Sequence, residues 1–541
     1  MKVDKKAGKL KSIALICSAV MLIGVFAGCG PRTGDGGGDN NSNIVYNGDK
    51  IYPVQSDDTL EYWMELTGLL SGQVTNFGET PLAQALEEQT GVKIKYIHPQ
   101  TGQASEQFNI LLAGDELPDI VGYAWNNFAG GPDKAIEDEY IYKLNDIFDK
   151  YAPNLRKYFD ENPDLDKALK TDTGSYYTFP FVRGDEIMTV GNGLIIRQDW
   201  LDDLGLEVPE TIDEWTNVLK EFKEKKNADA PLTSAGTGIR TPFMAAYDMT
   251  NSFYLDNGEV KFGPAQPAYK DFLITFKDWY SKGYLDNNIT SNDGIINDAN
   301  MLSGKSGASM GWVGSGLGKW TQAAASTGVE PYKLAATPFP VLEKGQKPEF
   351  GIKDSRLMPQ SGVAISTNCV NVELAARFLD FGYSEEGHTL YNFGIEGESF
   401  DWVGDYPTYT DLIMKNPNGL TISQALSAYT RASYSGIFVQ DRRYLEQYYE
   451  LDEQKEALLT YNNTNMAEHV MPPITLTVEE GEESTNILNN VTTYVDEMFI
   501  KFIKGEESIE NFDKYIEQLK SFGIERAVSI RQDALARFYQ R

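Results

Sequence analysis

One stretch, residues 175–205, separates two runs of alternating strand and helix patterns. It begins with aromatic residues around a proline, continues through two glycines and a short apolar strand, and ends in a short helix before Gly205. Pro180 fixes its own φ and favours an extended conformation at Phe179, so the chain continues across this point instead of turning back. We interpret residues 175–205 as a crossover between two lobes, with a ligand cleft beside it.

The patterns on both sides of this crossover predict α/β structure. Thr211 and Glu214 form a capping box ahead of an amphipathic helix, and a strand of small residues leads to Trp312. The final part of the chain is helical, with breaks at Gly505 and Gly523. The expected strands before the crossover alternate with helices over short links, which is typical of a parallel α/β sheet: residues 60–66, 92–96 and 117–121.

We therefore expect two α/β lobes, each built from separate segments of the chain. The first lobe comprises residues 59–182 and about 356–430. The second comprises residues 183–355 and about 431–541. Two lobes of this size can enclose a ligand between them.

The N-terminus has the pattern of a bacterial lipoprotein signal peptide over residues 1–28. Lysines precede an apolar segment, residues 13–26, that is too short to span a bilayer comfortably. Small residues then precede Cys29, which would be lipidated and become the mature N-terminus. Phe26 departs from the usual aliphatic residue at its position, and an ordinary secretory signal with an incidental cysteine is the alternative. Residues 29–58, rich in Gly, Asp and Asn, are expected to be a flexible tether.

Three cysteines exist, and they leave no pair for an internal disulfide. Cys17 lies in the apolar segment, Cys29 is the expected lipid site, and Cys369 remains alone. Stability must therefore come from a sizeable core. No other run of 18 apolar residues is present, so we expect a protein tethered by lipid to the extracytoplasmic face of the cell membrane.

The charge excludes two classes of partner. The formal net charge is −31, from 79 acidic and 48 basic residues. Such a surface repels nucleic acid and anionic membrane surfaces, so neither is expected to bind the body of the protein.

A series of motifs resembles one known family in the expected order over most of residues 60–525. None is specific alone, but the series is: QTGVKI, LLAGDELPDIV, IIRQDWLDDLGLEVPETIDEW, FKDWYSKGYLD, GASMGWVG, GVAISTNCVNVELAARFLDF and KFIKGEESIENFDKYIEQLKSFGIE. The chain resembles the extracellular solute-binding protein family 1 lipoproteins, the carbohydrate-binding subunits of ABC importers. It looks closest to the long branch of oligosaccharide and aldouronate binders.

The resemblance implies a two-lobed, periplasmic-binding-protein-like type II fold with an oligosaccharide bound between the lobes. It also implies separate ABC permease subunits as partners, and we expect the protein itself to be a monomer. Many relatives carry an EF-hand-like calcium loop after the capped helix. Here residues 225–229, KKNAD, lack the alternating oxygen ligands of such a loop, so no metal and no other cofactor is expected.

Aromatic side chains are the first candidates for sugar contact, because sugars offer flat C–H faces. Trp312 is the best placed, between glycines, and the corresponding tryptophan of the family commonly faces the sugar. Each candidate has an alternative role in core packing: Trp312, Trp125, Trp402, Trp63 and Tyr177.

Polar candidates lie in loops beside aromatic, glycine or proline segments. Arginines in a cleft would suit a carboxylated sugar, because the guanidinium pairs bidentately with carboxylate. Surface ion pairing is their alternative role, and Glu79 could accept hydrogen bonds from sugar hydroxyls. The arginines are Arg183, Arg240, Arg356 and Arg431.

No motif indicates an enzyme. The three histidines are far apart in sequence, and no G-x-S-x-G, H-E-x-x-H or Walker pattern is present. A glycosidase needs only two carboxylates, which so acidic a chain supplies by chance. A peptide- or pheromone-binding lipoprotein and a surface glycan-degrading enzyme are the alternatives to oligosaccharide transport.

Overall fold

The computed structural model describes residues 44–541, except residues 48–49, 71, 101, 115 and 329. The expected signal peptide, with Cys17 and Cys29, lies outside the described residues. Residues 42–541 belong to one compact unit. In the described part of the chain, every helix is too short or too polar to cross a bilayer.

A six-stranded sheet forms the centre of the first lobe, with the strand order β16-β6-β13-β5-β3-β4. The neighbours β4, β3 and β5 run parallel, as expected from the sequence, whereas β13 runs antiparallel to both β5 and β6. Its strands are β3 (Thr59–Trp63), β4 (Lys93–Ile97), β5 (Ile120–Gly122), β6 (Phe179–Arg183), β13 (Leu357–Ile365) and β16 (Val439–Gln440).

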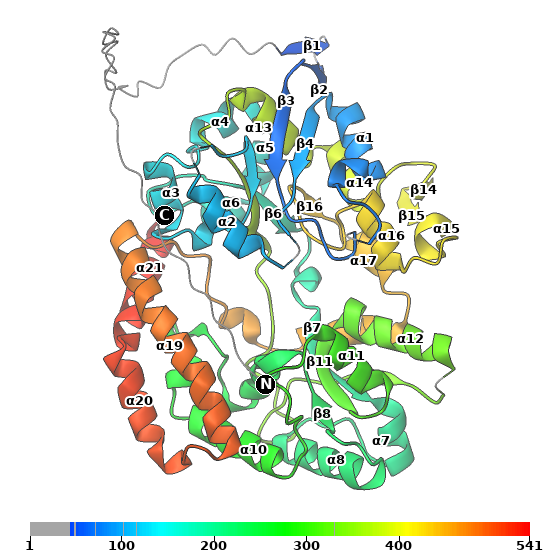
Figure 1. Ribbon diagram of the computed structural model, residues 1–541, viewed down its shortest axis with the longest axis vertical. Helices are drawn as coiled ribbons and strands as arrows, with labels where there is room; N and C mark the ends of the chain where they lie inside the picture. The colour runs from blue at the N-terminus through cyan, green and yellow to red at the C-terminus, as the bar shows by residue number, and fades with distance from the viewer. Residues whose placement is uncertain (1–43, 48–49, 71, 101, 115, 329) are drawn as a thin grey trace, which may run out of the picture. The chain divides into compact units, whose positions relative to one another are not determined.

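Helices cover this first sheet, and a small hairpin stands beside them (Figure 1). The helices are α1 (Pro81–Thr90), α2 (Ala104–Leu112), α3 (Gly131–Glu137), α4 (Asn145–Tyr151), α5 (Pro153–Glu161), α6 (Pro163–Leu169), α13 (Val372–Phe381), α14 (Glu385–Phe393), α15 (Asp411–Met414) and α16 (Ile422–Tyr429). The hairpin is β14 (Phe400–Val403) with β15 (Tyr406–Tyr409).

A four-stranded mixed sheet, β12-β7-β11-β8, forms the centre of the second lobe. The central strand β7 (Asn192–Arg197) runs antiparallel to β11 (Ala308–Trp312) and to β12 (Leu334–Ala336). Only the edge strand β8 (Leu232–Thr233) is parallel to its neighbour β11. The two lobes are therefore both α/β, as predicted, but neither sheet is wholly parallel.

The helices of the second lobe follow the periodicity of the sequence. The capping box of α8 is formed, since the Thr211 hydroxyl accepts from the Glu214 amide and the Glu214 carboxylate accepts from the Thr211 amide. The helices and strands of this lobe include α7 (Gln198–Leu204), α8 (Ile212–Lys225), α9 (Arg240–Met244), β9 (Phe253–Asp256), β10 (Glu259–Phe262), α10 (Tyr269–Ser281), α11 (Gly294–Leu302), α12 (Lys319–Thr327) and α18 (Asp452–Asn462). Helix α17 (Arg442–Tyr448) instead packs against the β14–β15 hairpin.

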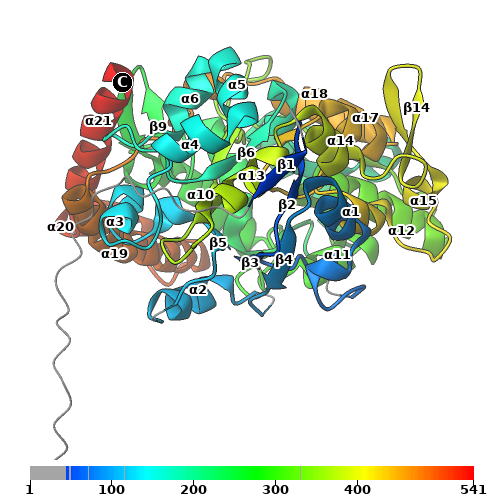
Figure 2. The same ribbon diagram turned by 90° about the horizontal axis from the view of Figure 1, so that it is seen from above.

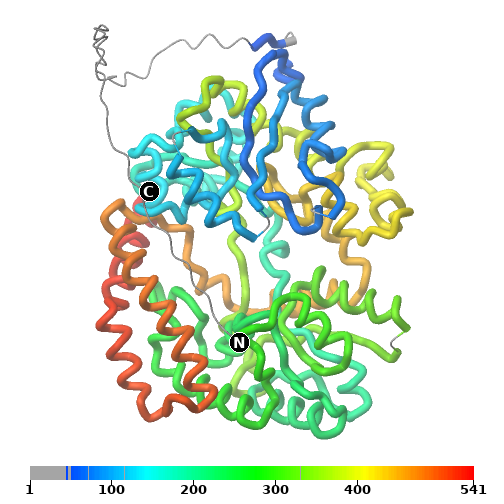
Figure 3. Tube along the Cα trace, in the orientation of Figure 1, coloured from blue at the N-terminus to red at the C-terminus, as the bar shows by residue number. Residues whose placement is uncertain are grey.

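Three long C-terminal helices pack along the second lobe (Figures 1 and 3). They are α19 (Val478–Lys504), α20 (Phe512–Ser521) and α21 (Ile524–Gln540). The expected break at Gly505 is confirmed, and this residue ends α19 in the left-handed conformation with φ 75°. The break at Gly523 is confirmed in the same way, because this glycine precedes α21 with φ 95°.

Residues 45–47 and 50–55 fall within the expected tether, but they form strands that are folded onto the first lobe. Strands β1 (Val45–Asn47) and β2 (Lys50–Gln55) pair antiparallel. The Tyr52 ring meets Phe381 of α13 edge-on at 5.0 Å, and its hydroxyl donates to the Arg377 carbonyl at 2.7 Å. These two strands therefore pack as part of the folded body.

The chain crosses between the sheets three times. Two of the crossovers run from β6, which ends at Arg183, to β7 and from β12 to β13, which begins at Leu357. The third follows β16, which pairs with β6 in the first sheet, and we therefore propose a boundary after residue 440 in place of the one expected near residue 430. Beyond it, the Tyr461 hydroxyl of α18 donates to the Leu194 carbonyl of β7 at 2.9 Å. A Cβ on Gly193 would lie 2.4 Å from that tyrosine ring, so glycine is required there.

The C-terminal helices also contact the first lobe, around Asp172. Arg537 and Arg541 of the C-terminal end both pair with the Asp172 carboxylate, which is almost buried. Arg537 also pairs with Glu480 in the first turn of α19 at 2.5 Å. The Asp172 amide donates to the Thr475 hydroxyl at 2.9 Å. Ionic contacts therefore join the end of the chain to the first lobe.

We predict that Asp172→Asn loosens this attachment. The change removes the charge that both arginines share and leaves Arg541 without a carboxylate, which costs roughly 2–4 kcal/mol for a nearly buried ion pair. Hydrogen exchange of α21 amides should become faster, and the melting temperature should fall. Asp533→Asn, on the exposed face of the same helix, is the control. Equal exchange in both variants would contradict the role of Asp172.

Candidate functional site

A pocket lies at the carboxyl edge of the six-stranded sheet, where α/β proteins bind ligands. Its accessible volume is about 230 Å³. Strand β3 contributes its end and the residues after it, β5 contributes Gly122 to Ala124, and the middle of β13 contributes Gln360 to Val363. The loop after α16 closes it with Arg431 and residues 434–436. Rigid strand ends therefore position most of this lining.

Arg431 is buried in this pocket without a carboxylate partner. Only 8% of the residue is exposed, and its Nε donates to the Ser435 carbonyl at 2.9 Å. Its guanidinium lies 4.6 Å from the ring centre of Tyr434 and 5.6 Å from that of Phe77. Burial lowers the pKa of Arg431. Among the residues that the structure describes, no acidic side chain lies within ion-pair distance of it, so the guanidinium can pair with an anionic ligand group.

Three aromatic candidates come together behind this pocket as one buried cluster. Trp63 lines the pocket and packs against Phe108, with ring centres 6.2 Å apart. Trp125 is fully buried, and its indole donates to the Val121 carbonyl at 3.1 Å. Tyr177 belongs to the same cluster, and burial raises the pKa of its phenol. Of the three, only Trp63 lines the pocket. Trp125 and Tyr177 are packed inside the cluster, where they support the sheet.

Trp312 lies at the carboxyl end of β11 in the second lobe and is 48% exposed. It pairs with Asn192 of β7, and a Cβ added at Gly191 would lie 3.5 Å from its ring. Because Gly191 has no side chain, the indole can lie over its backbone, and part of the indole stays exposed to solvent. An indole held in this way offers a flat stacking surface.

A buried polar network fixes the strands around Trp312. One carboxylate oxygen of Asp286 accepts from the Thr233 hydroxyl of β8 at 3.1 Å and from the side-chain amides of Asn292 and Asn300. The Ser309 hydroxyl of β11 donates to Asn297 at 2.9 Å. These hydrogen bonds favour one arrangement of β8 and β11, because any other would leave buried polar groups without partners and would raise the free energy of the folded state.

Two of the candidate arginines join the crossovers instead of lining the pocket. Arg183 donates to the Met188 carbonyl at 2.6 Å and pairs with Asp354 at 2.8 Å, so it links the first crossover to the second. Arg356 donates to the Arg183 carbonyl at 3.1 Å and the Gly184 carbonyl at 3.2 Å. Both guanidinium groups are engaged by the protein.

The remaining candidates lie elsewhere. Arg240 is buried in the second lobe, where it pairs with Asp496 of α19 at 2.7 Å and lies over Phe499. Glu79 is exposed and accepts from the Thr75 hydroxyl at 2.7 Å. Trp402 is 42% exposed on the β14–β15 hairpin, beside a different pocket. The structure thus brings Arg431 and Trp63 together but leaves these three apart from them.

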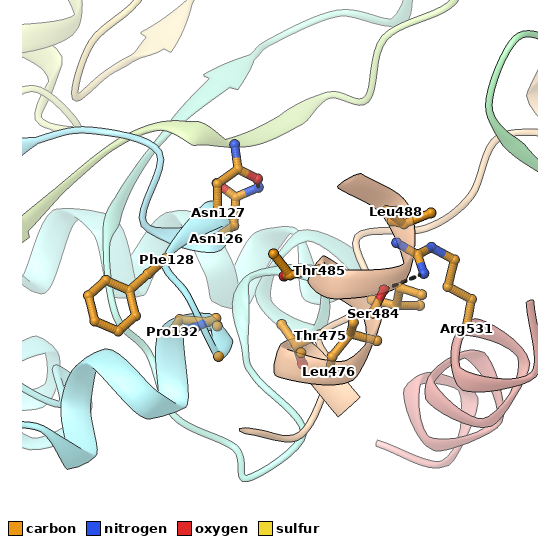
Figure 4. A pocket seen from close by; sticks show the side chains of 14 residues that line it. Asn126, Asn127, Phe128, Pro132, Thr475, Leu476, Ser484, Thr485, Leu488 and Arg531 are labelled. Carbon is orange, nitrogen blue, oxygen red and sulfur yellow. Dashed lines mark hydrogen bonds between the residues drawn. The ribbon is translucent and has the colours of Figure 1, made fainter. Parts of the chain in front are cut away.

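A second cavity, of about 310 Å³, lies where the first lobe meets α19 and α21 (Figure 4). Asn126, Asn127 and Pro132 line one side, and Ser484 and Thr485 line the other. Arg531 donates to the Ser484 hydroxyl at 2.9 Å, and burial lowers the pKa of Arg531 to about 10. Amides and hydroxyls in such a cavity can hold water or a polar ligand group, and none of the residues predicted from the sequence lies there.

Sequence reasoning missed several residues of the first pocket. Gln360 and Ser361 lie at the irregularity where β13 shifts its register against β6, and Tyr434 and Ser435 lie in the loop SYSG. The run of small polar residues around Tyr434 was the only available signal. These residues lie near Arg431 only because strands that are far apart in sequence pair with one another.

One family model matches residues 72–389, more than half of the chain, and its description is bacterial extracellular solute-binding protein. The resemblance based on sequence motifs is therefore confirmed.

Individual relatives match over nearly their full length. The chain is 25% identical to the fructooligosaccharide ABC transporter substrate-binding protein FusA of Streptococcus pneumoniae, covering 95% of this chain and 96% of FusA. It is 23% identical to the polygalacturonan/rhamnogalacturonan-binding protein YtcQ of Bacillus subtilis, covering 83% and 86%. The crystal structure of alginate-binding protein AlgQ2 without calcium ion matches with a TM-score of 0.73 and 26% identity, covering 88% of this chain and 98% of that one. The fold is thus that of the two-lobed solute-binding proteins.

We predict that Arg183→Met weakens the hinge and not the ligand contact. Removing the guanidinium leaves Asp354 and the Met188 carbonyl without their donor, which costs roughly 1–3 kcal/mol for partly buried groups. Thermal unfolding should show lower stability, and ligand affinity should change only slightly. Arg442→Met, at an exposed ion pair, is the matched control. If stability is unchanged and ligand binding is lost, Arg183 contacts the ligand.

Proposed function

Since the chain belongs to the bacterial extracellular solute-binding protein family, we propose that it captures an oligosaccharide by lobe closure and delivers it to an ABC importer permease. Proteins of this family and the matched relatives are substrate-binding proteins, so this chain is a binding protein and not an enzyme. The relatives FusA, YtcQ and AlgQ2 are named for the fructooligosaccharides, polygalacturonan or alginate that they bind. Their names support an oligosaccharide as the ligand of this chain.

The observation that carries the proposal is the pocket around Arg431 at the carboxyl edge of the first sheet. The exposed indole of Trp312 stands at the carboxyl end of a strand in the second sheet. In our proposal these are the two halves of one cleft. Trp312 stacks on the apolar face of a sugar ring, while Gln360, Ser361 and Tyr434 match its hydroxyls.

Closure by rotation about the crossovers would bring the halves together around the sugar. The ligand gains contacts with both lobes only in the closed state, so binding shifts the protein toward that state. A micromolar affinity requires a binding free energy of about −8 kcal/mol. Stacking and several hydrogen bonds worth about 1 kcal/mol each can supply it. The permease would then recognise the closed form.

The ligand that we propose is an oligosaccharide that carries a carboxylate, such as one with uronic acid units. Arg431 supports this because it is a buried cation with no acidic partner in the described part of the chain. A sugar carboxylate would pair with the guanidinium, whereas Glu65, the acidic residue in the lining of this pocket, lies beyond ion-pair distance of it. Polygalacturonan and alginate, the ligands for which YtcQ and AlgQ2 are named, are consistent with this choice.

We also propose that Cys29 carries lipid and holds the protein on the extracytoplasmic face of the membrane. The support is the sequence of the first 29 residues, with its basic start, apolar segment and small residues before the cysteine. A tether of about 15 residues would connect the lipid to β1.

We predict that Trp312→Ala weakens oligosaccharide binding at least tenfold. The loss of the indole removes the stacking surface, and the exposed position means that folding should be unaffected. A thermal-shift screen of neutral and uronic-acid oligosaccharides identifies the ligand, and calorimetry then measures the dissociation constant. The control is Tyr539→Ala, an exposed aromatic residue on α21. Unchanged affinity in the Trp312 variant would remove this residue from the site.

We predict that Arg431→Met weakens the binding of acidic sugars more than the binding of neutral sugars. Binding of a carboxylated oligosaccharide should weaken by about 100-fold or more, which corresponds to the loss of roughly 3 kcal/mol from a charge-assisted pair. The free protein should lose only about 1 kcal/mol of stability, because the replaced cation has no carboxylate partner and its Nε makes one hydrogen bond, to the Ser435 carbonyl. Calorimetry with an acidic sugar and its neutral counterpart measures the difference, and Arg431→Lys tests whether charge alone suffices. Equal loss for both sugars would contradict a carboxylate contact.

A further inference from the structure

The β14–β15 hairpin presents an apolar edge on a firmly held base. Phe400 is buried, and the Tyr409 hydroxyl donates to the Asn392 carbonyl at 2.7 Å. Gln447 of α17 is hydrogen-bonded to both the Tyr409 amide and the Pro407 carbonyl at 2.8 Å. At the outer end, Trp402 is 42% exposed and Val403 is 65% exposed. Figure 2 shows the hairpin extending beyond the helices next to it.

A pocket of about 580 Å³ lies beside this hairpin, and we call its lining together with Val403 the Trp402 surface. Phe400, Leu390 and Ile395 supply apolar walls. Trp402 meets Phe400 edge to face, with ring centres 5.5 Å apart, so the indole is fixed while part of it stays uncovered. The remaining lining is polar and acidic: Gln89, Glu385, Glu386, Thr389, Gly394 and Glu396.

The acidic groups of the Trp402 surface have no cationic partners. Among the described residues, Glu385, Glu386 and Glu396 form no ion pair, and no lysine or arginine lines the pocket. Asp401 and Asp405 of the hairpin add further negative charge. Glu385 and Glu386 stabilise the first turn of α14, but this role does not account for Glu396 or for the exposed indole. The surface therefore complements a cationic partner and repels an acidic sugar.

We propose that the Trp402 surface docks onto the importer permease, through a basic segment that places an apolar side chain against Trp402. The inference rests on the proposed function only for the existence of that permease. A fixed, partly exposed tryptophan is the residue type that most often dominates binding energy at a protein interface. Unpaired carboxylates around it would accelerate association and make it sensitive to salt.

A reversible contact of this size fits a protein that must dock and leave once in every transport cycle. A hairpin edge and one pocket form a small interface, which is typical of transient complexes. The strands that line the Arg431 pocket contribute nothing to the Trp402 surface. Sugar binding and docking should therefore be separable by substitution.

The first test places a photo-crosslinking benzoylphenylalanine at position 403 of the full-length protein in its native cell. Irradiation should yield an adduct with an integral membrane permease subunit, identified by mass spectrometry. The same amino acid at the exposed position 539 of α21 should yield no such adduct. This test needs no transported sugar, so it decides the docking proposal even if the ligand is not an oligosaccharide. An adduct at 539 but none at 403 would overturn the inference.

The second test measures uptake and binding side by side. In cells that lack the natural gene, Trp402→Ala and Glu386→Lys should each reduce sugar uptake at least tenfold, while the calorimetric affinity of the purified variant stays within twofold of wild type. The matched controls are Tyr539→Ala and Glu517→Lys, at exposed positions of α21 and α20. Full uptake by both Trp402-surface variants would overturn the proposal. Loss of sugar affinity in Trp402→Ala would also overturn it, by placing Trp402 in the sugar site. Failure of wild-type protein to bind any sugar would instead refute the proposed function.

Discussion

The structure depends on crossovers that are held to one another as well as to their own lobes. Arg183 links two of them through the Met188 carbonyl and Asp354, and Arg356 returns hydrogen bonds to the Arg183 and Gly184 carbonyls. At the third crossover, burial alone would raise the pKa of Asp441, but hydrogen bonds from His388 and Arg443 hold it well below its ordinary value. Hydrogen bonds and ion pairs of this kind are directional, so they fix the positions of the crossovers relative to one another. Apolar packing alone would fix those positions less strictly.

Local elements could be predicted from the sequence because their signals are local. The capping box at Thr211, the turn between β9 and β10, and the glycines that end α7 and α19 each depend on a few neighbouring residues. The antiparallel course of β13 could not be predicted, because it depends on pairing with β5 and β6 more than 170 residues earlier. The strand β16 was not predicted either, because two residues are too few to give a periodic sequence pattern.

The candidate site was harder to predict than the fold, because exposure is a property of the tertiary structure. Trp125 follows β5 and Trp312 is the last residue of β11, yet the first is fully buried and the second is nearly half exposed. The difference comes from their neighbours: Phe108 and Phe128 cover Trp125, whereas Gly191 leaves Trp312 uncovered. Arginines in loops gave equally ambiguous signals. Arg240 and Arg431 are buried to a similar degree, but only Arg240 has an acidic partner.

That contrast suggests how stability and function are divided in this protein. A buried cation with a carboxylate partner can be structural, because the pair compensates much of the desolvation of both groups. A buried cation that keeps its polar surroundings but lacks a counter-charge destabilises the empty protein, and selection retains such a group when a ligand supplies the missing charge. The exposed indole of Trp402 can be interpreted in the same way, since its apolar surface is in contact with water and a partner would cover it. In our proposal, each of these groups marks a position where another molecule binds.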